Sequence, residues 1–385
     1  MKRTRLRGFV LFWILEASVV KGLYIHIPFC VQKCKYCDFA SYVGQESRID
    51  EYLHRLQCEM QQYKDAKIDT VFIGGGTPSV LGAERISQLM QGIKNNFSLA
   101  PNCEITMESN PGTLDEKKIH SMLENGINRV SVGVQSFNDA ELEAIGRIHN
   151  AELAYNSICL LKSYGFTNIN LDLMTALPFQ TMDSLKNSLK TAVSLPITHI
   201  SAYSLIIEDN TPLEREYSQG KLILPTEDED RNMYKFAVEY LRENGFVRYE
   251  ISNFAKWGFE CRHNIKYWSC DEYIGIGAAA HSYIGAKRYS NPTGLLDYIS
   301  GGKDEEVVLE PNDKISEFMM MGLRMDRGIN CSEFKKRFGV RIEEIFSKQI
   351  EKFISLGLMK QCGDNYSLTD MGIDISNSIL CEFMI

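Results

Sequence analysis

The sequence predicts an α/β protein, a partial (β/α)6 barrel of the TIM type followed by a small, mostly helical, winged-helix-like domain. From Leu23 onward, short runs rich in β-branched and aromatic residues alternate with longer amphipathic helical stretches. This alternation is typical of a parallel sheet with right-handed crossovers. Beyond Pro311 the pattern becomes predominantly helical. Because only six β-rich runs precede that point, an open or partial barrel is favoured over a closed eight-stranded one.

Each predicted barrel strand ends in a turn or a polar residue, and an amphipathic helical pattern separates it from the next. The strands are LYIHI (23–27), DTVFI (69–73), EITM (104–107), RVSVGV (129–134), NINLDLM (168–174) and THISAYSL (198–205). We expect four segments: a leader (1–21), the barrel (22–250), a connecting region (251–310) and the C-terminal domain (311–385).

Composition narrows the class of protein. At 385 residues the chain suits a barrel-sized domain with an appendage, and 44% hydrophobic with 24% charged residues is typical of a soluble globular protein. A formal net charge of -8 argues against a general nucleic-acid binder, which normally carries a basic surface. Eleven cysteines in a chain of this length resemble reduced cytosolic thiols, some of them metal ligands, rather than a disulfide scaffold.

The first twenty residues complicate this interpretation. MKRTRLR followed by FVLFWIL imitates a signal peptide, but Glu16 and the lack of a small-x-small cleavage site weaken the match. The apolar run is also shorter than the ~20 residues that span a membrane. We expect residues 1 to about 20 to be a non-native leader, with an export signal and a membrane-surface helix as alternatives. The rest of the chain predicts a cytoplasmic protein.

Polar residues with chemical potential follow the predicted strands. Three cysteines follow the first strand, GGGTP the second and Glu108 the third; Gln135 follows the fourth, and Asp172 lies near the end of the fifth. In barrels of this kind the chemistry lies at the carboxyl ends of the strands. We therefore expect these residues, distant in sequence, to converge at one mouth.

The cysteines Cys30, Cys34 and Cys37 have the spacing C-x3-C-x2-C. Thiolates so close together suit iron-sulfur or zinc. A structural zinc would need a fourth ligand, and neither a second cysteine pair nor a suitably spaced histidine follows nearby. A disulfide would leave one thiol over and would require an oxidising compartment. The spacing therefore favours an iron-sulfur site with one position left for another ligand.

The glycine triplet in VFIGGGTPS fits the same interpretation. Glycines let backbone N–H groups approach a ligand that a Cβ atom would hold away, and Thr77-Pro78 ends the turn rigidly. Alone, this is weak evidence, because tight turns use glycine for geometry. Beside the cysteine loop it strengthens the case for a cofactor site.

C-x3-C-x2-C after the first barrel strand resembles the radical S-adenosylmethionine (SAM) superfamily. That resemblance implies a 4Fe-4S cluster on the three cysteines, with SAM bound at the fourth iron. GLYIHIPFC, GGGTPS, ESNPGT, GVQSFND, IGRIH, NLDLMTALP and EISNFAK are similar to one branch of it, which contains oxygen-independent coproporphyrinogen III dehydrogenases and haem chaperones. The resemblance covers nearly the whole chain after Gly22.

The resemblance also implies a set of SAM contacts, which are Tyr24, Tyr36, Gly75, Gly76, Thr77, Glu108, Gln135, Arg147 and Asp172. Their chemistry fits: a carboxylate suits ribose hydroxyls or an ammonium group, Arg147 suits a carboxylate, and Gln135 offers a neutral hydrogen bond. The alternative for each charged residue is a helix cap or a surface charge.

A second motif, CRHNIKYW (261–268), resembles the H-N-x-x-Y-W motif of the haem chaperones, with His263, Asn264, Tyr267 and Trp268 in place. An imidazole can ligate haem iron, and the two aromatic rings offer a flat apolar surface to a macrocycle. The alternative is a packed turn in which His263 hydrogen-bonds a carbonyl group. Cys261 and His281 are lesser candidates for haem contact.

Two differences from the dehydrogenase pattern distinguish this chain from the dehydrogenases. The dehydrogenases have a further cysteine where this chain has Phe39, and they carry a longer amino-terminal segment. Both departures resemble the haem chaperones, which implies a protein that binds haem and passes it to haem-accepting proteins at the membrane, without being an integral membrane protein. Coproporphyrinogen dehydrogenase activity is then not expected, although the radical SAM site is intact. The decarboxylating enzyme remains the alternative, and a radical RNA-modifying enzyme would need a basic module that is not visible.

The remaining segments are less distinctive. GIGAAAHSYIGAKRYSNP (275–292) reads as a glycine-rich loop that crosses close to a ligand. From Pro311 to Ile385 ten lysines and arginines stand against eleven aspartates and glutamates, so the predicted winged-helix-like domain has no basic excess for DNA. We expect it to serve as a lid or a partner-docking unit.

Overall fold

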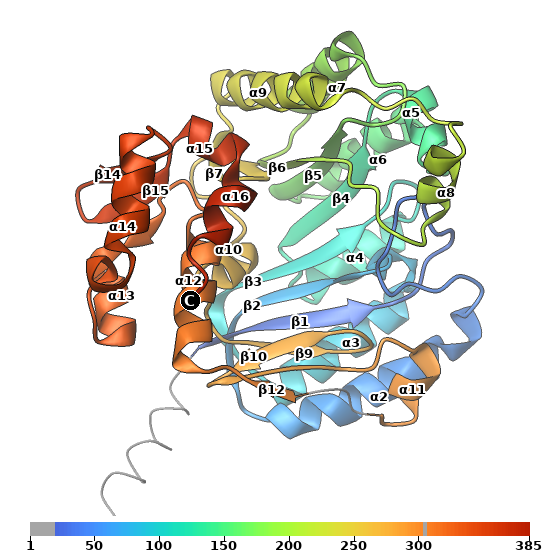
Figure 1. Ribbon diagram of the computed structural model, residues 1–385. Coiled ribbons are helices and arrows are strands. Elements are labelled where there is room, and N and C mark those ends of the chain that lie inside the picture. Colours follow the sequence, from blue (N-terminus) through green and yellow to red (C-terminus); the bar gives the residue numbers. More distant parts are fainter. Residues whose placement is uncertain (1–19, 303–305) are drawn as a thin grey trace, which may run out of the picture.

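The computed structural model describes residues 20–302 and 306–385 (Figure 1). The predicted leader, apart from its last residues, lies outside the described residues. In the described part, no helix combines the length and apolar character needed to cross a membrane.

Six neighbouring parallel strands form the centre of the fold, as predicted. They are β1 (Lys21–Ile27), β2 (Lys67–Gly75), β3 (Ser98–Ser109), β4 (Arg129–Gln135), β5 (Asn168–Thr175) and β6 (His199–Ser204). They lie side by side in chain order within a twelve-stranded sheet. The sheet curves without closing, and Figure 1 shows its strands pointing toward one side of the molecule. The predicted partial barrel is thereby confirmed.

Along these strands, side chains that face the hydrophobic core alternate with side chains that face the barrel interior. Leu23, Ile25 and Ile27 of β1 are fully buried in the main hydrophobic core, as are Val71 and Ile73 of β2. Successive side chains of a strand point to opposite faces, so the residues between these positions face the inside of the barrel. The helices that follow these strands in the chain are α2 (Ile49–Met60), α3 (Ala83–Asn96), α4 (Glu116–Glu124), α5 (Asp139–Ala144), α6 (Ala151–Ser163), α7 (Met182–Ser194), α8 (Pro212–Ser218) and α9 (Glu227–Glu243).

Short strands extend the sheet at both edges. β8 (Asn253–Ala255) and β7 (Val247–Glu250) continue it antiparallel from β6. At the other edge β9 (Tyr273–Ile276) pairs parallel with β1, and the antiparallel strands β10 (His281–Ile284), β11 (Lys287–Ser290) and β12 (Glu306–Val308) follow. Helix α10 (Arg262–Trp268) precedes β9, and helix α11 (Leu295–Ile299) lies between β11 and β12.

The prediction of a glycine-rich loop over residues 275–292 was wrong. Most of that segment is the strands β9, β10 and β11. Gly275 faces the backbone of His281 so closely that a Cβ atom there would overlap it. Glycine is therefore a requirement of close strand packing at this position, and four-residue strands give too short an alternation to recognise in the sequence.

The C-terminal domain has its own hydrophobic core, which includes Phe334, Phe346 and Phe383. Its elements are α12 (Pro311–Gly322), β13 (Ile329–Asn330), α13 (Cys331–Phe338), α14 (Ile342–Ser355), β14 (Met359–Cys362), β15 (Asn365–Leu368), α15 (Asp370–Asp374) and α16 (Ser376–Cys381). Helices with a three-stranded antiparallel sheet match the expected winged-helix-like fold. Arg248 of β7 ties this domain to the barrel by ion pairs with Asp326 and Asp370.

Candidate cofactor site

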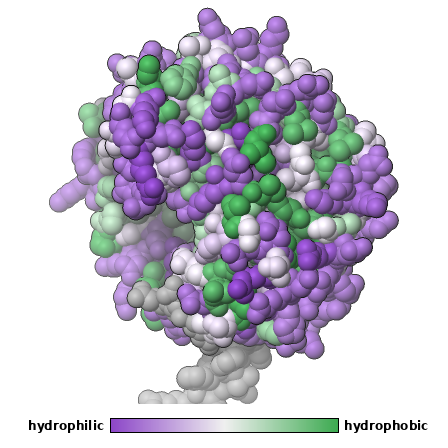
Figure 2. Space-filling view, turned by 90° about the vertical axis from the view of Figure 1, so that its right-hand side faces the viewer, coloured by the Kyte–Doolittle hydropathy of each residue, from purple (hydrophilic) through white to green (hydrophobic). Residues whose placement is uncertain are grey.

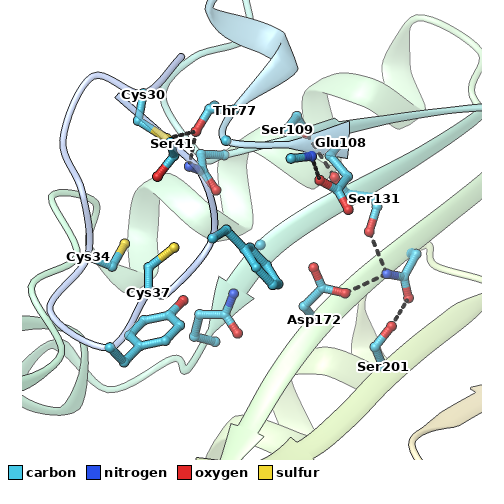
Figure 3. Close-up of a pocket in the computed structure, with 18 of the residues that line it drawn as sticks. Cys30, Cys34, Cys37, Ser41, Thr77, Glu108, Ser109, Ser131, Asp172 and Ser201 are labelled. Atoms are coloured by element: carbon cyan, nitrogen blue, oxygen red, sulfur yellow. Dashed lines mark hydrogen bonds between the residues drawn. The ribbon is translucent and has the colours of Figure 1, made fainter. Parts of the chain in front are cut away.

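A cavity of about 450 Å³ lies over the carboxyl ends of the parallel strands. Eleven of the predicted cluster and SAM residues line it: Cys30, Cys34, Tyr36, Cys37, Gly75, Gly76, Thr77, Glu108, Gln135, Arg147 and Asp172. Figure 3 shows the cysteine loop on one side of this cavity and the acidic and polar strand ends on the other. The expected convergence of sequence-distant residues is therefore present, and we call this space the mouth cavity.

The cysteine loop is held by backbone hydrogen bonds to other parts of the chain. The N–H of Cys30 donates to the carbonyl of Tyr42, and the N–H of Lys35 donates to that of Ile145, both at 3.0 Å. Cys30 is 8% exposed, and its Sγ lies 3.4 Å from Oγ1 of Thr77. Burial raises the pKa of the Cys30 thiol and also that of Cys37.

The donor set suits an iron-sulfur cluster in type, number and location. Thiolate is the usual protein ligand of such clusters, and three thiols here share one loop and one cavity. Within the described residues, no three Cys, His, Asp or Glu side chains already form a group fit to hold a single metal ion. A 4Fe-4S cluster is larger than one ion and takes one cysteine on each of several irons, so the three thiols fit it without meeting at one point.

Two glycines let the second loop approach the cysteine loop. Gly75 has φ +113°, and a Cβ atom there would lie 2.6 Å from the ring of His26. A Cβ atom on Gly76 would lie 2.8 Å from the carbonyl oxygen of Phe29 and 3.0 Å from Sγ of Cys30. All three distances are shorter than a packed Cβ contact, so a larger residue at Gly75 would displace His26 of β1, and one at Gly76 would push the two loops apart.

Two carboxyl groups face the mouth cavity in surroundings that disfavour their charge. Burial, assisted by the negative charge of Asp172, raises the pKa of Glu108 to about 8. Burial also raises the pKa of Asp172, although Asn170 donates a hydrogen bond of 2.7 Å to its Oδ1. The N–H of Gly75 donates to Oε2 of Glu108 at 3.1 Å. A ligand carrying positive charge would stabilise both carboxylates, as the ammonium and sulfonium groups of SAM would.

Arg147 faces the same cavity and is linked to the cysteine loop. Its Nη1 donates to Oδ1 of Asn110 at 3.0 Å, and Nδ2 of Asn110 donates to Oγ1 of Thr77 at 2.9 Å. Its Nε is buried without a hydrogen-bond partner among the described residues. The guanidinium carbon lies 6.0 Å from the centre of the Tyr36 ring. A cation with unused donor capacity is suited to a ligand carboxylate.

Several residues of the mouth cavity were missed by the sequence analysis: Asn110, Ser131, Asn170, Ser201 and Tyr203. Asn170 connects two strands, since its Nδ2 lies 2.7 Å from both Ser131 Oγ and Asp172 Oδ1. The hydroxyl of Tyr203 donates to Oε1 of Gln135 at 3.2 Å. Four of them could have been found from the period of two along a strand, because alternate residues face inward: Ser131, Asn170, Ser201 and Tyr203. Asn110 follows β3 and has no such signal.

A second cavity, of about 560 Å³, adjoins the first and shares Phe39, Gly75 and Glu108 with it. Aromatic residues dominate its wall: Tyr24, Tyr267, Trp268, Tyr273 and Tyr283. Tyr24, predicted to contact SAM, therefore lies in this aromatic cavity, where its hydroxyl donates to Nδ1 of His26 at 2.9 Å. Phe39 is 63% exposed where the two cavities meet.

The H-N-x-x-Y-W motif is divided between the two cavities. Tyr267 and Trp268 line the aromatic cavity, and Asn264 lines the mouth cavity. His263 is fully buried, with its ring nitrogens 2.9 Å from the hydroxyls of Thr70 and Tyr267. Burial, with the positive charges of Lys266 and Arg129, lowers the pKa of His263 to about 3. Both nitrogens have partners inside the protein, so this arrangement supports the packed alternative for His263 rather than direct contact with haem iron.

Cys261, a lesser candidate for haem contact, is also fully buried, with its Sγ 3.7 Å from Oε1 of Glu104. Glu104 also accepts hydrogen bonds from the backbone N–H groups of Arg262 and His263, at 3.2 Å each. These contacts fix the start of α10 against β3. Cys261 and His263 thus form a structural anchor, whereas Asn264, Tyr267 and Trp268 reach the cavities.

Comparison with known proteins shows which protein family this chain belongs to. Residues 24–192 match the family model of the radical SAM superfamily, and residues 309–375 match that of the HemN C-terminal domain. The heme chaperone HemW of Lactococcus lactis is 38% identical over 94% of this chain and 97% of its own length. The HemW proteins of Bacillus subtilis and Escherichia coli are 37% and 34% identical, with 95% and 94% of this chain and 99% and 98% of their own lengths covered.

Among solved structures, coproporphyrinogen III oxidase (HemN) of Escherichia coli, a radical SAM enzyme, superposes with a TM-score of 0.83 at 22% identity. The likeness covers 98% of this chain and 93% of that one, and at this identity it establishes the fold. The sequence identities over nearly full length go further. The chain belongs to the HemW family of the radical SAM superfamily.

Proposed function

We propose that this protein is a haem chaperone that holds a 4Fe-4S cluster on Cys30, Cys34 and Cys37, binds SAM in the mouth cavity and carries haem in the aromatic cavity. The observation that carries the proposal is the pair of adjoining cavities: one polar and next to three thiols, the other aromatic, with Phe39, Gly75 and Glu108 shared between them. A chaperone that couples a cofactor to a macrocyclic cargo needs two such neighbouring sites.

The residues of the mouth cavity have distinct roles in this proposal. When bound, the cluster and SAM supply one-electron chemistry. Arg147 binds the carboxylate of SAM, while Glu108 and Asp172 compensate its positive charge or accept hydrogen bonds from ribose hydroxyls. Gly75 and Gly76 leave room for the ligand beside the cysteine loop, and Gln135 offers its amide group. Tyr36 shields the site from solvent beside Arg147.

The aromatic cavity has the size and character of a haem site. Ligand sites of drug-sized molecules have volumes of about 300 to 1,000 Å³ and mostly apolar walls with a few polar groups. Tyr24, Tyr267 and Trp268 offer ring faces and edges to a macrocycle. The exposed residue Phe39 lines both cavities, at the position where the dehydrogenases have a further cysteine. That difference supports carriage of haem over decarboxylation of a porphyrinogen.

Delivery of haem requires contact with an acceptor. Figure 2 views the side toward which the barrel strands point, where a strip of apolar side chains crosses a largely polar face. Exposed apolar residues on this side include Val31 and Phe39 after β1, Phe179 after β5 and Ile206 after β6. Ile148 after α5 and Ile223 after α8 are also exposed. Apolar surface gathered in this way is typical of an interaction site. We propose that haem-accepting proteins, membrane-associated ones among them, dock there, with the chaperone itself in the cytoplasm and at the membrane only transiently.

The test starts from anaerobically reconstituted protein. Haem is titrated while the Soret band is followed, and coproporphyrinogen III loss is assayed in parallel with SAM and a reductant. We expect saturable haem binding without turnover of coproporphyrinogen III. Robust formation of protoporphyrinogen, or absence of saturable haem binding, would overturn the proposal.

A further inference from the structure

One wall of the aromatic cavity is a face of the sheet extension. Tyr273 of β9 is the cross-strand partner of Tyr283 of β10, and Tyr283 is the partner of Arg288 of β11. His281 lies two residues before Tyr283 on the same strand, and alternate residues of a strand share a face. All four side chains accordingly line the cavity. The sheet extension thus presents two phenol rings, one imidazole and one guanidinium to the same space.

The opposite walls come from the ends of two helices and from the cysteine loop. Tyr267 and Trp268 end α10, Met321 lies on α12 of the C-terminal domain, and Phe39 belongs to the loop after β1. The ring of Tyr267 meets that of Tyr273 edge to face, with centroids 4.6 Å apart. These two rings therefore form one continuous aromatic surface, along which a flat macrocycle in the cavity would lie.

Haem iron bound in this cavity needs an axial ligand from its wall, and the wall offers few. The imidazole of His26 is engaged on both sides, because its Nε2 donates to the carbonyl of Ala40 and its Nδ1 accepts from Tyr24. Burial raises the pKa of the Cys270 thiol to about 12, which disfavours the thiolate form that ligates haem. His281, by contrast, is exposed to solvent, and its side chain forms no hydrogen bond within the described part of the chain.

Arg288 adds a cation at the same wall. Its Nη2 donates to Oε2 of Glu317 on α12 at 2.8 Å, and its guanidinium lies over the Tyr283 ring at 5.4 Å. Its Nε is buried and has no hydrogen-bond partner among the described residues. Guanidinium groups bind carboxylates well, and haem carries two propionates. The cavity thus combines an imidazole for iron and a cation for a propionate on neighbouring strands.

Building on the proposed function, we infer that His281 is the axial ligand of haem iron in the aromatic cavity and that Arg288 binds a haem propionate. A lone pair of the neutral imidazole forms the bond to iron, so the step needs neither a redox partner nor a leaving group. His281 replaces His263 in this role, and Tyr267 and Trp268 of the sequence motif form the facing wall. Because Arg288 also contacts α12, the C-terminal domain takes part in holding the cargo.

The experiment titrates ferric haem into the full-length, anaerobically reconstituted protein. The variants are His281→Ala, His263→Ala and His120→Ala; His120 is an exposed histidine on α4, on the outside of the barrel, and serves as the control. We expect His281→Ala to shift the Soret band and to lower haem affinity about tenfold or more. Added imidazole should restore the wild-type spectrum of that variant. The His120→Ala variant should match the wild type in both respects.

The outcomes separate this inference from the proposed function. If wild-type protein fails to bind haem saturably, the proposed function itself is wrong. If wild-type protein binds haem and His281→Ala keeps the same affinity and the same Soret band, the axial ligand lies elsewhere while the chaperone proposal stands. Should His281→Ala lose its fold by circular dichroism, His281→Met supplies a different ligand atom; an unchanged haem spectrum in that variant would contradict the inference equally.

Discussion

The two cavities of this protein are neighbours built in different ways. The mouth cavity lies on the carboxyl ends of long parallel strands, and its wall is polar, with Glu108, Arg147 and Asp172 facing inward. The aromatic cavity lies between short antiparallel strands, the end of α10 and the C-terminal domain. Most residues that line the first lie within 24–192, the segment that matches the radical SAM family model, whereas most residues that line the second come from later elements. The difference fits the proposed division of roles, in which the barrel holds the cofactors and the later elements contribute most of the haem site.

The largest expected effect follows from removing a cysteine ligand. The Cys34→Ala variant should lose the visible iron-sulfur absorption and the bound iron, because two thiols do not hold a 4Fe-4S cluster that leaves one iron open. Absorption spectroscopy and iron analysis after anaerobic reconstitution measure this. Cys362→Ala, at an exposed cysteine of the C-terminal domain, is the matched control and should keep the cluster.

The same variant tests whether the two cavities act separately. Cys34 lines the mouth cavity and does not line the aromatic cavity, so Cys34→Ala should still bind haem saturably. If Cys34→Ala loses both the cluster and haem binding, the haem site depends on the cluster. The two cavities would then not act as separate cofactor and cargo sites.

The next largest effect concerns the contact between the two loops at the mouth. In Gly76→Ala the added Cβ would meet the carbonyl oxygen of Phe29 at 2.8 Å and Sγ of Cys30 at 3.0 Å. One of these contacts is to rigid backbone, so we expect a loss of about 1 to 3 kcal/mol in the free energy of unfolding and poor reconstitution of the cluster. Chemical denaturation and iron content are the measurements.

Gly82→Ala is the control for that substitution. A Cβ atom at Gly82 has no neighbour within 4 Å, and its φ of -70° is accessible to alanine. We expect a change of at most about 1 kcal/mol, from the weaker helix capping of alanine at the start of α3. Equal losses in both variants would indicate that the close approach of the loops carries no special cost.

A smaller effect is expected at the wall of the aromatic cavity. Arg288→Gln should weaken haem binding about three- to tenfold by removing the charge that faces a propionate. Titration of haem measures it, and cluster content should stay unchanged because Arg288 lies outside the mouth cavity. Glu317→Gln removes only the partner of Arg288 on α12. If Glu317→Gln weakens haem binding as strongly as Arg288→Gln, the effect arises from domain docking and not from a propionate contact.

The mouth cavity could largely be predicted from the sequence, whereas the aromatic cavity could not. The six parallel strands and the convergence of the cysteines, the glycine loop, Glu108, Gln135 and Asp172 followed from alternation and from the rule that parallel strands end at one edge. The aromatic cavity did not, because β9, β10 and β11 are four residues long and their pairing depends on contacts between distant segments. Asn170 and Tyr203 lay within predicted strands, but recognising them required knowing which face points inward.

His263 shows a further limit. Its residue type and motif predicted a ligand, yet the surroundings decide the role of a histidine. Thr70 on β2 and Tyr267 on α10 are distant from each other in sequence, and together they occupy both ring nitrogens. His281, outside the motif, is the imidazole that the fold leaves open to the cavity. Only the packing of α10 against β2 distinguishes the roles of these two histidines, His263 and His281.

The smallest effect concerns the acid stability that follows from burying His263. Its pKa is lowered to about 3 in the folded protein, against an ordinary value near 6.5, with burial as the main cause and the charges of Lys266 and Arg129 adding to it. As the pH falls below about 6.5, the unfolded chain takes up a proton that the folded protein refuses, so the free energy of unfolding decreases down to about pH 3. Between pH 7.5 and pH 6 the contribution of His263 is a loss of about 1 kcal/mol.

Urea denaturation at pH 7.5, 6.5 and 6 measures this loss, and the comparison is made between wild type, His263→Gln and His120→Ala. Other buried histidines with lowered pKa values, His26, His149 and His199, contribute to the slope in all three proteins. The expected result is a shallower pH dependence in His263→Gln alone, since glutamine keeps hydrogen-bonding capacity toward Thr70 and Tyr267 but does not titrate. If His263→Gln retains the wild-type slope, His263 is accessible to protons in the folded protein, and its role as a buried anchor, in contrast to the open His281, would have to be abandoned.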